Sequence, residues 1–307
     1  MQLYGVCITI DGSKTVINDR GKQAFRPTGL SDIDQANYEQ QVHDIIAAFS
    51  KTSTGSCLLA QLAGSITVHP QSRDMLYAGS MPLNWVNATA KGILPGITEY
   101  NVSTDTFATQ QMARSVGTGK GSDSMVFFTP SIYTVDHGPG SLGDEVLLHE
   151  MVHALRETMG MHHGILTVHN PVDKCYDNDE EFYAILVANI YMSEKTKNCQ
   201  RLCANHHPLR VGSKVEMSNL LFTGRVDDFA DPKIFYREYR DDLRDFCKEM
   251  SSFTLSLADV SAPFNPLREL YDNPENNDLP HGWRQKPGQA PTDPAMWQDD
   301  LGHPYGL

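Results

Sequence analysis

The stretch VLLHEMVHALR, residues 146–156, carries most of what this sequence says about its fold. It lies within 142–160, where apolar residues recur at helical spacing and form a wide stripe. Gly160 follows the last apolar position, and glycine is the residue type that most often ends a helix. The pattern therefore predicts a helix over 142–160. On such a helix His149 and His153, four residues apart, lie on one face.

The two histidines and the glutamate between them form the pattern H-E-x-x-H, which is typical of a helix that binds one zinc ion. Glu150 directly follows the first histidine, close enough to hold a metal-bound water without being a ligand. Zinc lowers the pKa of its bound water to about 7. The motif thus predicts hydrolysis of a peptide bond, with Glu150 as the general base that later delivers the proton to the leaving amine. In the alternative interpretation, His149 and His153 only pack at the edge of the core.

A catalytic zinc ion usually has three protein ligands and one open position, so a third ligand must come from elsewhere in the chain. In the metzincin arrangement it is a histidine at position 159, and a variant of that arrangement has an aspartate there. The chain has Met159, which excludes both. The remaining common solution is a glutamate on a second, downstream helix. Apolar periodicity predicts such a helix over 179–194.

Two glutamates near the start of this second helix are candidates for the third ligand. Glu181 is followed, three and seven residues later, by Ala184 and Ala188, and such small residues let two helices approach closely. The same offsets from Glu180 give bulkier residues, so Glu181 is favoured and Glu180 is the alternative. The competing ligands are the histidines of the intervening loop, namely His162, His163 and His169.

Three further polar residues are candidates for supporting roles. A hydrolytic zinc site normally needs another donor for the developing oxyanion. Tyr176, five residues before Glu181, is the candidate for this role, although a core or surface position is the more common interpretation of a tyrosine. Glu145, one helical turn before His149, and Asn189 are candidates to hold an imidazole N–H, or equally to be solvated helix residues.

The composition is that of an ordinary globular chain with an excess of acidic residues. Hydrophobic residues make up 40% of the 307, and 25 Lys and Arg stand against 38 Asp and Glu, for a net charge of −13. Nucleic-acid binding needs a cationic face, so no nucleic-acid partner is expected. No apolar run approaches the roughly 18–20 residues of a membrane span, and the first residues lack the pattern of a Sec signal peptide. The six cysteines are spread thinly and predict no particular disulfide.

Shorter patterns organise the rest of the chain. Residues 3–18 alternate between apolar and polar types around Asp11-Gly12, which predicts a hairpin with its turn there. Ser31 and Asp34 resemble a helix cap and precede apolar residues at helical spacing. Further helices are predicted over 57–62 and 232–250, and strands over 66–68 and 124–129.

The glycine-rich segment 117–122 does not form a phosphate-binding loop. That loop requires a glycine five residues before its Gly-Lys pair, and Arg114 occupies this position. The segment instead predicts a flexible turn that leads into the strand after it. That strand, 124–129, is expected to lie near the cleft and to bind an extended peptide by strand addition.

These patterns divide the chain into three parts. Residues 1–30 form an N-terminal hairpin or extension, and residues 31–271 form the metallopeptidase domain. Six of the 17 prolines fall in 272–307, which predicts a tail that is extended or wraps the surface. Trp283 and Trp297 would anchor such a wrap.

The chain resembles the gluzincin-type zinc metallopeptidases that bacteria use as effectors, in particular the metallopeptidase domains of type VI secretion spike proteins and type III effector peptidases. The matching segments are VLLHEMVHALR (146–156), DEEFYAILVANIY (179–191), GTGKGSDSMVFFTP (117–130) and FNPLRE (264–269). The segment EFYA (181–184) also looks like the zinc-glutamate segment of anthrax lethal factor. The resemblance implies a zincin fold and one Zn²⁺ held by His149, His153 and Glu181.

The resemblance also implies where such a protein acts. A toxin-like role against a protein or peptide substrate is expected in a target cell. The protein would be cytoplasmic in its producer and would leave it through a specialised secretion system. A secretion carrier or adaptor and a cognate immunity protein are then expected partners.

The sequence thus predicts an α+β, zincin-like zinc endopeptidase with one active-site helix and one downstream glutamate-bearing helix. Two alternatives stay open. A zinc amidase that acts on cell-wall peptides would use the same metal site. A non-catalytic binding module stabilised by zinc would have four protein ligands and no open position.

Overall fold

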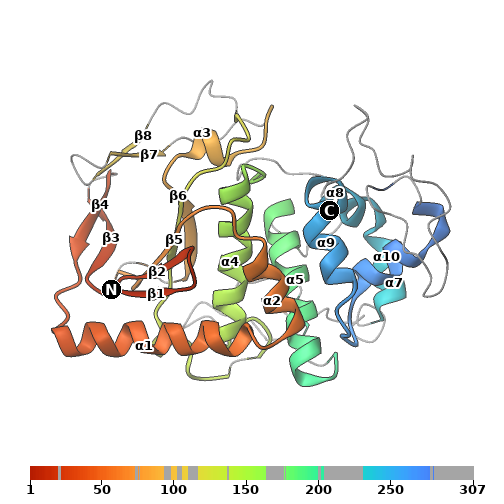
Figure 1. Ribbon diagram of the computed structural model, residues 1–307, viewed down its shortest axis with the longest axis horizontal. Helices are drawn as coiled ribbons and strands as arrows, with labels where there is room; N and C mark the ends of the chain where they lie inside the picture. The colour runs from red at the N-terminus through yellow and green to blue at the C-terminus, as the bar shows by residue number, and fades with distance from the viewer. Residues whose placement is uncertain are drawn as a thin grey trace, which may run out of the picture.

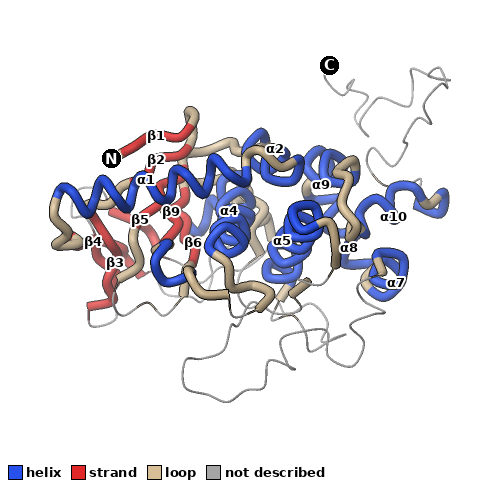
Figure 2. The backbone as a smooth tube through the Cα atoms, turned by 90° about the horizontal axis from the view of Figure 1, so that it is seen from below, coloured by secondary structure: helices blue, strands red, loops and turns tan. Residues whose placement is uncertain are grey.

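The computed structural model describes the following residues: 1–19, 22–72, 75, 77–92, 98–101, 106–109, 117–136, 138–163, 176, 178–199, 202–203, 231–276 and 279. The architecture is α+β, as predicted. Strands gather at one end of the molecule together with α1 and α3, most other helices gather at the other end, and α4 lies between them (Figures 1 and 2).

The larger sheet has five strands in the order β1-β2-β5-β9-β6. The three inner strands, β2 (Ile8–Ile10), β5 (Ile66–His69) and β9 (Ser124–Phe127), run parallel to one another. The outer strands β1 (Gln2–Tyr4) and β6 (Gly79–Pro82) are antiparallel to their neighbours. The strands predicted at 66–68 and 124–129 are therefore confirmed, and both lie inside the sheet.

A second sheet of four antiparallel strands stands beside the first. Its order is β3-β4-β8-β7, formed by β3 (Lys14–Asp19), β4 (Lys22–Pro27), β8 (Thr106–Thr109) and β7 (Thr98–Asn101). The long β3–β4 hairpin supplies half of it.

The hairpin predicted around Asp11-Gly12 is wrong. The first hairpin joins β1 to β2 and turns at residues 5–7, where Gly5 has φ 63°. Asp11-Gly12 instead carries the chain from one sheet to the other: the Asp11 amide donates to the Val68 carbonyl and the Gly12 amide to a carboxylate oxygen of Glu39. The alternation in the sequence is genuine, but β2 uses its second edge for β5, so it cannot also pair with β3.

Two helices follow the N-terminal strands. α1 (Asp32–Phe49) begins at the predicted cap, where the Ser31 side chain accepts a hydrogen bond from the Asp34 amide. It packs across β1 and β2, as Figure 2 shows, and its inward residues join the main core. The helix predicted over 57–62 is confirmed as α2 (Ser53–Ala60), which begins four residues before the predicted start.

The two predicted central helices are present and lie side by side (Figure 1). α4 (Gly143–Met159) ends at Gly160, whose φ of 71° is the left-handed conformation that glycine adopts most readily. α5 (Asp179–Thr196) begins at Asn178, whose side chain accepts from the Glu181 amide at 3.0 Å. α4 packs against β6 and β9 on one side and α5 on the other, so almost all of it is buried.

The glycine-rich segment 117–122 packs against the C-terminal end of α4. The Ser122 amide donates to the Glu157 carbonyl of α4. The Gly121 amide donates to a carbonyl within the short helix α3 (Trp85–Ala88), and the Gly119 amide donates to the carbonyl directly after it. A Cβ at Gly121 would lie 2.0 Å from the Thr158 carbonyl oxygen. Glycine is therefore required there for close packing.

The C-terminal part of the described chain is helical. The single helix predicted over 232–250 is instead two helices, α7 (Pro232–Glu238) and α8 (Arg240–Glu249). The break falls at Tyr239, which leaves the helical conformation and packs its buried ring against Phe182 and Phe235. Two more helices, α9 (Ser251–Ala258) and α10 (Pro266–Asp272), and the short turns η1 (Pro130–Tyr133) and η3 (Pro274–Asn276) complete the fold.

The boundaries drawn at residues 30 and 271 stay predictions. Most of the proline-rich segment 272–307, with Trp283 and Trp297, lies outside the described residues, as does Cys175. Within the described part of the chain, no helix is both long enough and apolar enough to cross a membrane.

Candidate metal centre and active site

His149 and His153 lie on the face of α4 that is turned toward α5. Each residue is almost buried, at 6% exposure, since the helix is held between the sheet and α5. Their Nε2 atoms are 3.0 Å apart and therefore converge on one point. The one-turn spacing that the sequence predicted has placed two imidazole lone pairs together.

Glu181, in the first turn of α5, lies beside these two histidines. His149, His153 and Glu181 together form the metal group. The Oε2 atom of Glu181 lies 3.2 Å from His149 Nε2 and 3.6 Å from His153 Nε2. Ligands about 2.0–2.2 Å from a tetrahedral zinc ion are separated from one another by about 3.3 Å. The three donor atoms therefore form one face of a tetrahedron of the right size for a small divalent cation.

Among the described residues, His149, His153 and Glu181 are the one His, Cys, Asp and Glu group whose ligand atoms converge in this way. Within the described part of the chain, three donors leave the fourth corner of a tetrahedron without a protein ligand, as in catalytic rather than structural zinc sites. The residues present therefore fit one divalent ion.

The charges around this point are strongly coupled. Burial by itself would raise the pKa of Glu181, but the imidazoles of His153 and His149 hold that pKa well below its usual range. Burial likewise disfavours protonated His153, yet the carboxylates of Glu181 and Glu180 raise the pKa of His153 well above its ordinary value. A cation held by these residues would replace this proton, so metal binding would compete with protonation.

The structure distinguishes the two candidate glutamates. Glu180 binds Arg156, whose guanidinium donates to both carboxylate oxygens at 2.7–2.9 Å. One oxygen of Glu180 also lies 3.7 Å from Nδ1 of His153, on the far side of the ring from the metal position. Glu181 therefore belongs to the metal group, whereas Glu180 contacts the other ring nitrogen of His153.

Arg156 is the centre of a buried ionic cluster. It is completely buried, it binds Glu249 at 2.8 Å as well as Glu180, and its guanidinium stacks over the Tyr183 ring. His163 extends the cluster by pairing with Glu249 at 2.7 Å. Burial lowers the tendency of His163 to protonate, but Asp179 and Glu249 raise its pKa to about 9. The cluster ties α4, α5 and α8 together behind the metal group.

Glu150 lies beside the metal group without joining it. It is buried, which raises the pKa of its carboxyl above the ordinary value, although His149 and His153 oppose the shift. A carboxyl in this position can accept and release a proton close to neutral pH more readily than an exposed one.

A cavity opens in front of the metal group. It encloses about 580 Å³ of empty space, its open mouth included. Besides the metal group, the cavity is lined by β6 and the residue before it, by α3 and by the loop after α4. These lining residues include Ala78, Gly79, Ser80, Trp85, His162 and His163. A peptide segment can therefore reach the metal position alongside β6.

The prediction that the strand at 124–129 binds an extended peptide by strand addition is wrong. β9 pairs with β5 on one side and with β6 on the other, so its backbone groups are already used. β6 is the edge strand of this sheet. It escaped prediction because its sequence, Gly79–Pro82, has no alternation and contains both glycine and proline.

The remaining predicted residues lie in different surroundings. The Tyr176 ring packs against Phe182 and Tyr239, and Tyr176 is not among the residues that line the two cavities beside His149. Asn189 is buried and exchanges two hydrogen bonds with the Cys203 backbone, which fixes that segment to α5. Glu145 lines a cavity beside His149.

Of the three loop histidines, the two that the structure describes do not join the metal group. His162 lines the cavity, and burial lowers its pKa to about 4, so it is a neutral imidazole. His163 belongs to the Arg156 cluster. His169 lies outside the described residues.

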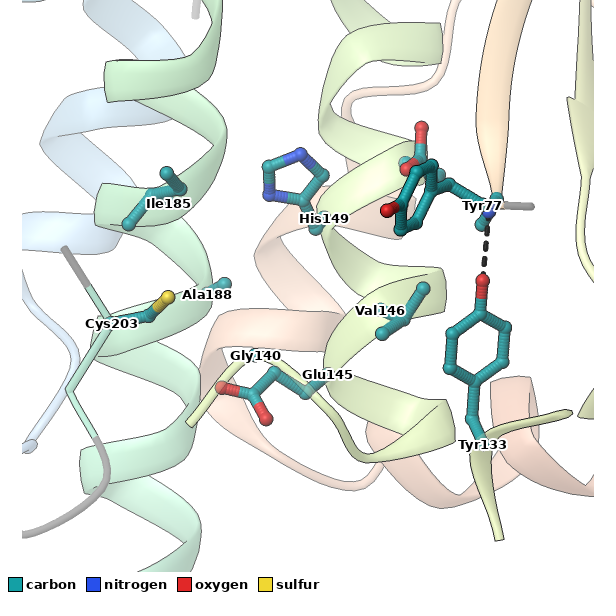
Figure 3. Close-up of a pocket in the computed structure, with 11 residues that line it drawn as sticks. Tyr77, Tyr133, Gly140, Glu145, Val146, His149, Ile185, Ala188 and Cys203 are labelled. Atoms are coloured by element: carbon teal, nitrogen blue, oxygen red, sulfur yellow. Dashed lines mark hydrogen bonds between the residues drawn. The ribbon is translucent and has the colours of Figure 1, made fainter. Parts of the chain in front are cut away.

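The sequence analysis missed two tyrosines beside the motif. Tyr77 and Tyr133 line the cavity next to His149 and Glu150 (Figure 3), and the Ala78 amide donates to the Tyr133 hydroxyl at 2.7 Å. Neither belongs to a helix or strand pattern that includes the motif, so no periodicity linked them to it.

Comparison with known families adds independent evidence. The model of peptidase family M91, described as an effector protein, matches residues 27–201, which is more than half of the chain and includes both α4 and α5. The chain belongs to the M91 family. A search of curated proteins finds no match.

Membership in the M91 family, together with the converging His-His-Glu group, makes the chain a metallopeptidase and an effector protein. The predicted zincin-like layout, with two histidines on α4 and a glutamate on α5, is confirmed. The resemblance to bacterial effector metallopeptidases is thereby confirmed at the level of the family.

Proposed function

We propose that the chain is a zinc-dependent endopeptidase in which His149, His153 and Glu181 hold one Zn²⁺. The observation that carries the proposal is the spacing of 3.0, 3.2 and 3.6 Å between their donor atoms, which suits a tetrahedral ion with one open corner. When bound, zinc would lower the pKa of a water molecule and polarise the scissile carbonyl.

The side chains around the ion would carry the proton. Glu150 accepts it from the attacking water and passes it to the amine that leaves, which its buried carboxyl suits because its pKa is raised. Glu180 keeps His153 oriented through the Nδ1 side of the ring. The oxyanion role of Tyr176 stays a prediction; Tyr77 is a second candidate, because it lines the cavity next to His149 and Glu150.

The substrate would bind as an extended segment along β6. Among the described residues β6 is the edge strand of the larger sheet, and its Gly79 and Ser80 line the cavity. Main-chain hydrogen bonds to an edge strand would hold a peptide irrespective of its sequence. Such binding places a peptide bond, rather than a side chain, in front of the metal group.

As an effector, the protein would act in a target cell after leaving its producer through a specialised secretion system. The M91 match supports the effector role and is silent on the route, so type VI or type III delivery, a carrier or adaptor and an immunity protein stay predictions.

The test is to purify the chain with zinc, measure metal content by mass spectrometry, and assay cleavage of a peptide library. Glu150→Gln is expected to retain zinc while hydrolysis falls by about 10²–10⁴-fold. Hydrolysis at the wild-type rate by fully loaded Glu150→Gln would contradict the proposal.

The two alternatives give different results in the same experiment. A cell-wall amidase would cleave isolated cell-wall peptides and leave protein-derived peptides intact. If the zinc site is structural, X-ray absorption would show four protein ligands, and the protein would cleave neither substrate.

A further inference from the structure

The cavity in front of the metal group has many polar side chains in its walls, and most of them are already engaged. Two are held in ion pairs, Glu180 with Arg156 and His163 with Glu249. Others serve the metal group, proton transfer, the cap of α5 or the junction with the sheet: His149, His153, Glu181, Glu150, Asn178 and Ser80. His162 also lines the cavity and takes part in none of these contacts.

His162 is a buried polar side chain without a hydrogen bond. The residue is 6% exposed, and its Nδ1 atom is buried. Neither of its ring nitrogens donates or accepts a hydrogen bond within the part of the chain that the structure describes. Most buried polar atoms of folded proteins are hydrogen-bonded, so this ring in a cavity wall calls for a partner from outside the chain.

The surroundings of His162 hold its ring in place. Its amide donates to the Ala88 carbonyl at 3.1 Å, and its carbonyl accepts from the Ala90 amide at 2.9 Å, so both of its main-chain groups are used. Its ring packs edge-on against Trp85, with ring centroids 5.2 Å apart. The imidazole is therefore fixed at the cavity wall before a ligand arrives, which reduces the entropy lost on binding.

An extended peptide along β6 would supply the partner that His162 lacks. A strand that pairs through one edge uses the N–H and C=O groups of alternate residues, and those of the other residues point away from β6. Groups that the cavity shields from water need a partner there. The neutral imidazole of His162 offers one donor and one acceptor, so it can pair with an N–H or a C=O group.

We propose that His162 is a substrate-binding residue, whose imidazole forms a hydrogen bond with the main chain of the peptide beside the scissile bond. The inference rests on the proposed peptidase function. Because every peptide carries main-chain groups, His162 contributes to the binding of all substrates alike and does not select among their side chains. It lies outside the metal group, so it binds the peptide without holding the ion.

The experiment compares the zinc-loaded wild type, His162→Phe and His162→Gln on the peptides that the wild type cleaves. Phenylalanine keeps a ring against Trp85 and removes both nitrogens, whereas glutamine keeps an amide that can donate and accept. His162→Phe should raise KM about tenfold for every peptide and leave kcat within about threefold, because the lost hydrogen bond is made equally in the ground and transition states. His162→Gln should restore most of the lost affinity.

The matched control is His43→Phe. His43 also packs edge-on against an aromatic ring, that of Tyr4, with ring centroids 5.2 Å apart, but it does not line this cavity. Its variant should keep the wild-type KM and kcat. If His162→Phe does not fold, judged by circular dichroism, His162→Leu removes the same nitrogens in a smaller side chain, and the same rise in KM is expected.

Binding gives a readout that is independent of turnover. Zinc-loaded Glu150→Gln should bind a peptide of the library, and adding His162→Phe should raise the Kd about tenfold in isothermal titration calorimetry, while zinc affinity stays within about twofold. An unchanged Kd, a loss confined to peptides with one kind of side chain, or a loss of zinc would overturn the inference and leave the peptidase function standing. If the wild type cleaves no peptide and Glu150→Gln binds none, both fail.

Discussion

Adjacent glutamates on α5 have opposite neighbours, although their chemistry is identical. Glu181 points toward the two Nε2 atoms of the motif, whereas Glu180 binds the completely buried guanidinium of Arg156. Arg156 holds the pKa of Glu180 well below its usual range even though burial alone would raise it. One residue of helical rotation therefore separates the proposed metal ligand from a structural ion pair.

These surroundings predict different consequences for the two matched variants. Glu181→Gln should lose most of the zinc affinity and fold as well as the wild type. Glu180→Gln should destabilise the fold by about 3–5 kcal/mol, because it leaves the buried Arg156 with one carboxylate partner fewer. Chemical denaturation without metal and zinc titration measure the two effects separately. Loss of zinc binding only in Glu180→Gln would reverse the assignment.

At the scale of elements, the junction between the sheet and α4 depends on one buried carboxyl. Glu157 accepts hydrogen bonds from Ser124 of β9 and, at 3.1 Å, from Ser80 of β6. Burial raises the pKa of Glu157 to about 8, above its ordinary value of 4.5. The carboxyl is therefore neutral at pH 7 and joins the helix to the last two strands of the larger sheet, β9 and β6.

This raised pKa predicts a pH dependence of stability. Below pH 4.5 both folded and unfolded Glu157 are protonated, so its contribution to stability is complete. Between pH 4.5 and 8 only the unfolded state loses its proton, so the contribution falls as pH rises. Glu157→Gln should remove this loss and unfold with a free energy higher than the wild type by about 2–4 kcal/mol at pH 9, measured by urea denaturation. An equal difference in unfolding free energy between Glu157→Gln and the wild type at pH 4 and at pH 9 would contradict this prediction.

The loop that packs on the end of α4 predicts a second effect at this scale. Gly121 has φ 82°, and a Cβ there would meet the Thr158 carbonyl, so Gly121→Ala should cost about 3 kcal/mol or more. Gly29 has φ 73° with no atom within 4 Å of its Cβ position, so Gly29→Ala should cost only about 1 kcal/mol. Urea denaturation of both variants separates the clash from the backbone strain. Equal costs would show that 117–122 does not need close packing.

For the whole molecule, a metal ion at this site would join α4 to α5, the two helices at the centre of the fold. Binding to the folded state alone stabilises it by about 2.7 kcal/mol when the free ion is at a hundred times its Kd. Removing the ion with a chelator should therefore lower Tm by several degrees, and zinc should restore it. Glu181→Gln should show no such shift in differential scanning calorimetry.

The same linkage sets the pH dependence of metal binding. Because Glu181 and Glu180 raise the pKa of His153, its proton competes with the ion as pH falls. Zinc affinity, measured by competition with a chelating dye, should decrease steadily from pH 8 to pH 5.5. An affinity independent of pH would contradict the assignment of His153 as a ligand.

The sequence by itself determined the features that depend on local spacing. Helical periodicity and a four-residue interval placed His149 and His153 on one face of α4, and Ser31 marked the start of α1 because capping involves only neighbouring residues. Small residues after Glu181 indicated the helix that approaches the motif. The first two features rest on interactions between residues close together in the chain.

Tertiary structure alone decided which distant groups meet. The partner of β2 is β5, more than fifty residues later, so the local hairpin pattern at Asp11-Gly12 was overridden. The edge position of β6 and the place of His162 in the cavity wall are likewise products of packing between separate elements. Such contacts leave no period in the sequence, because burial in the assembled fold, and not local propensity, selects them.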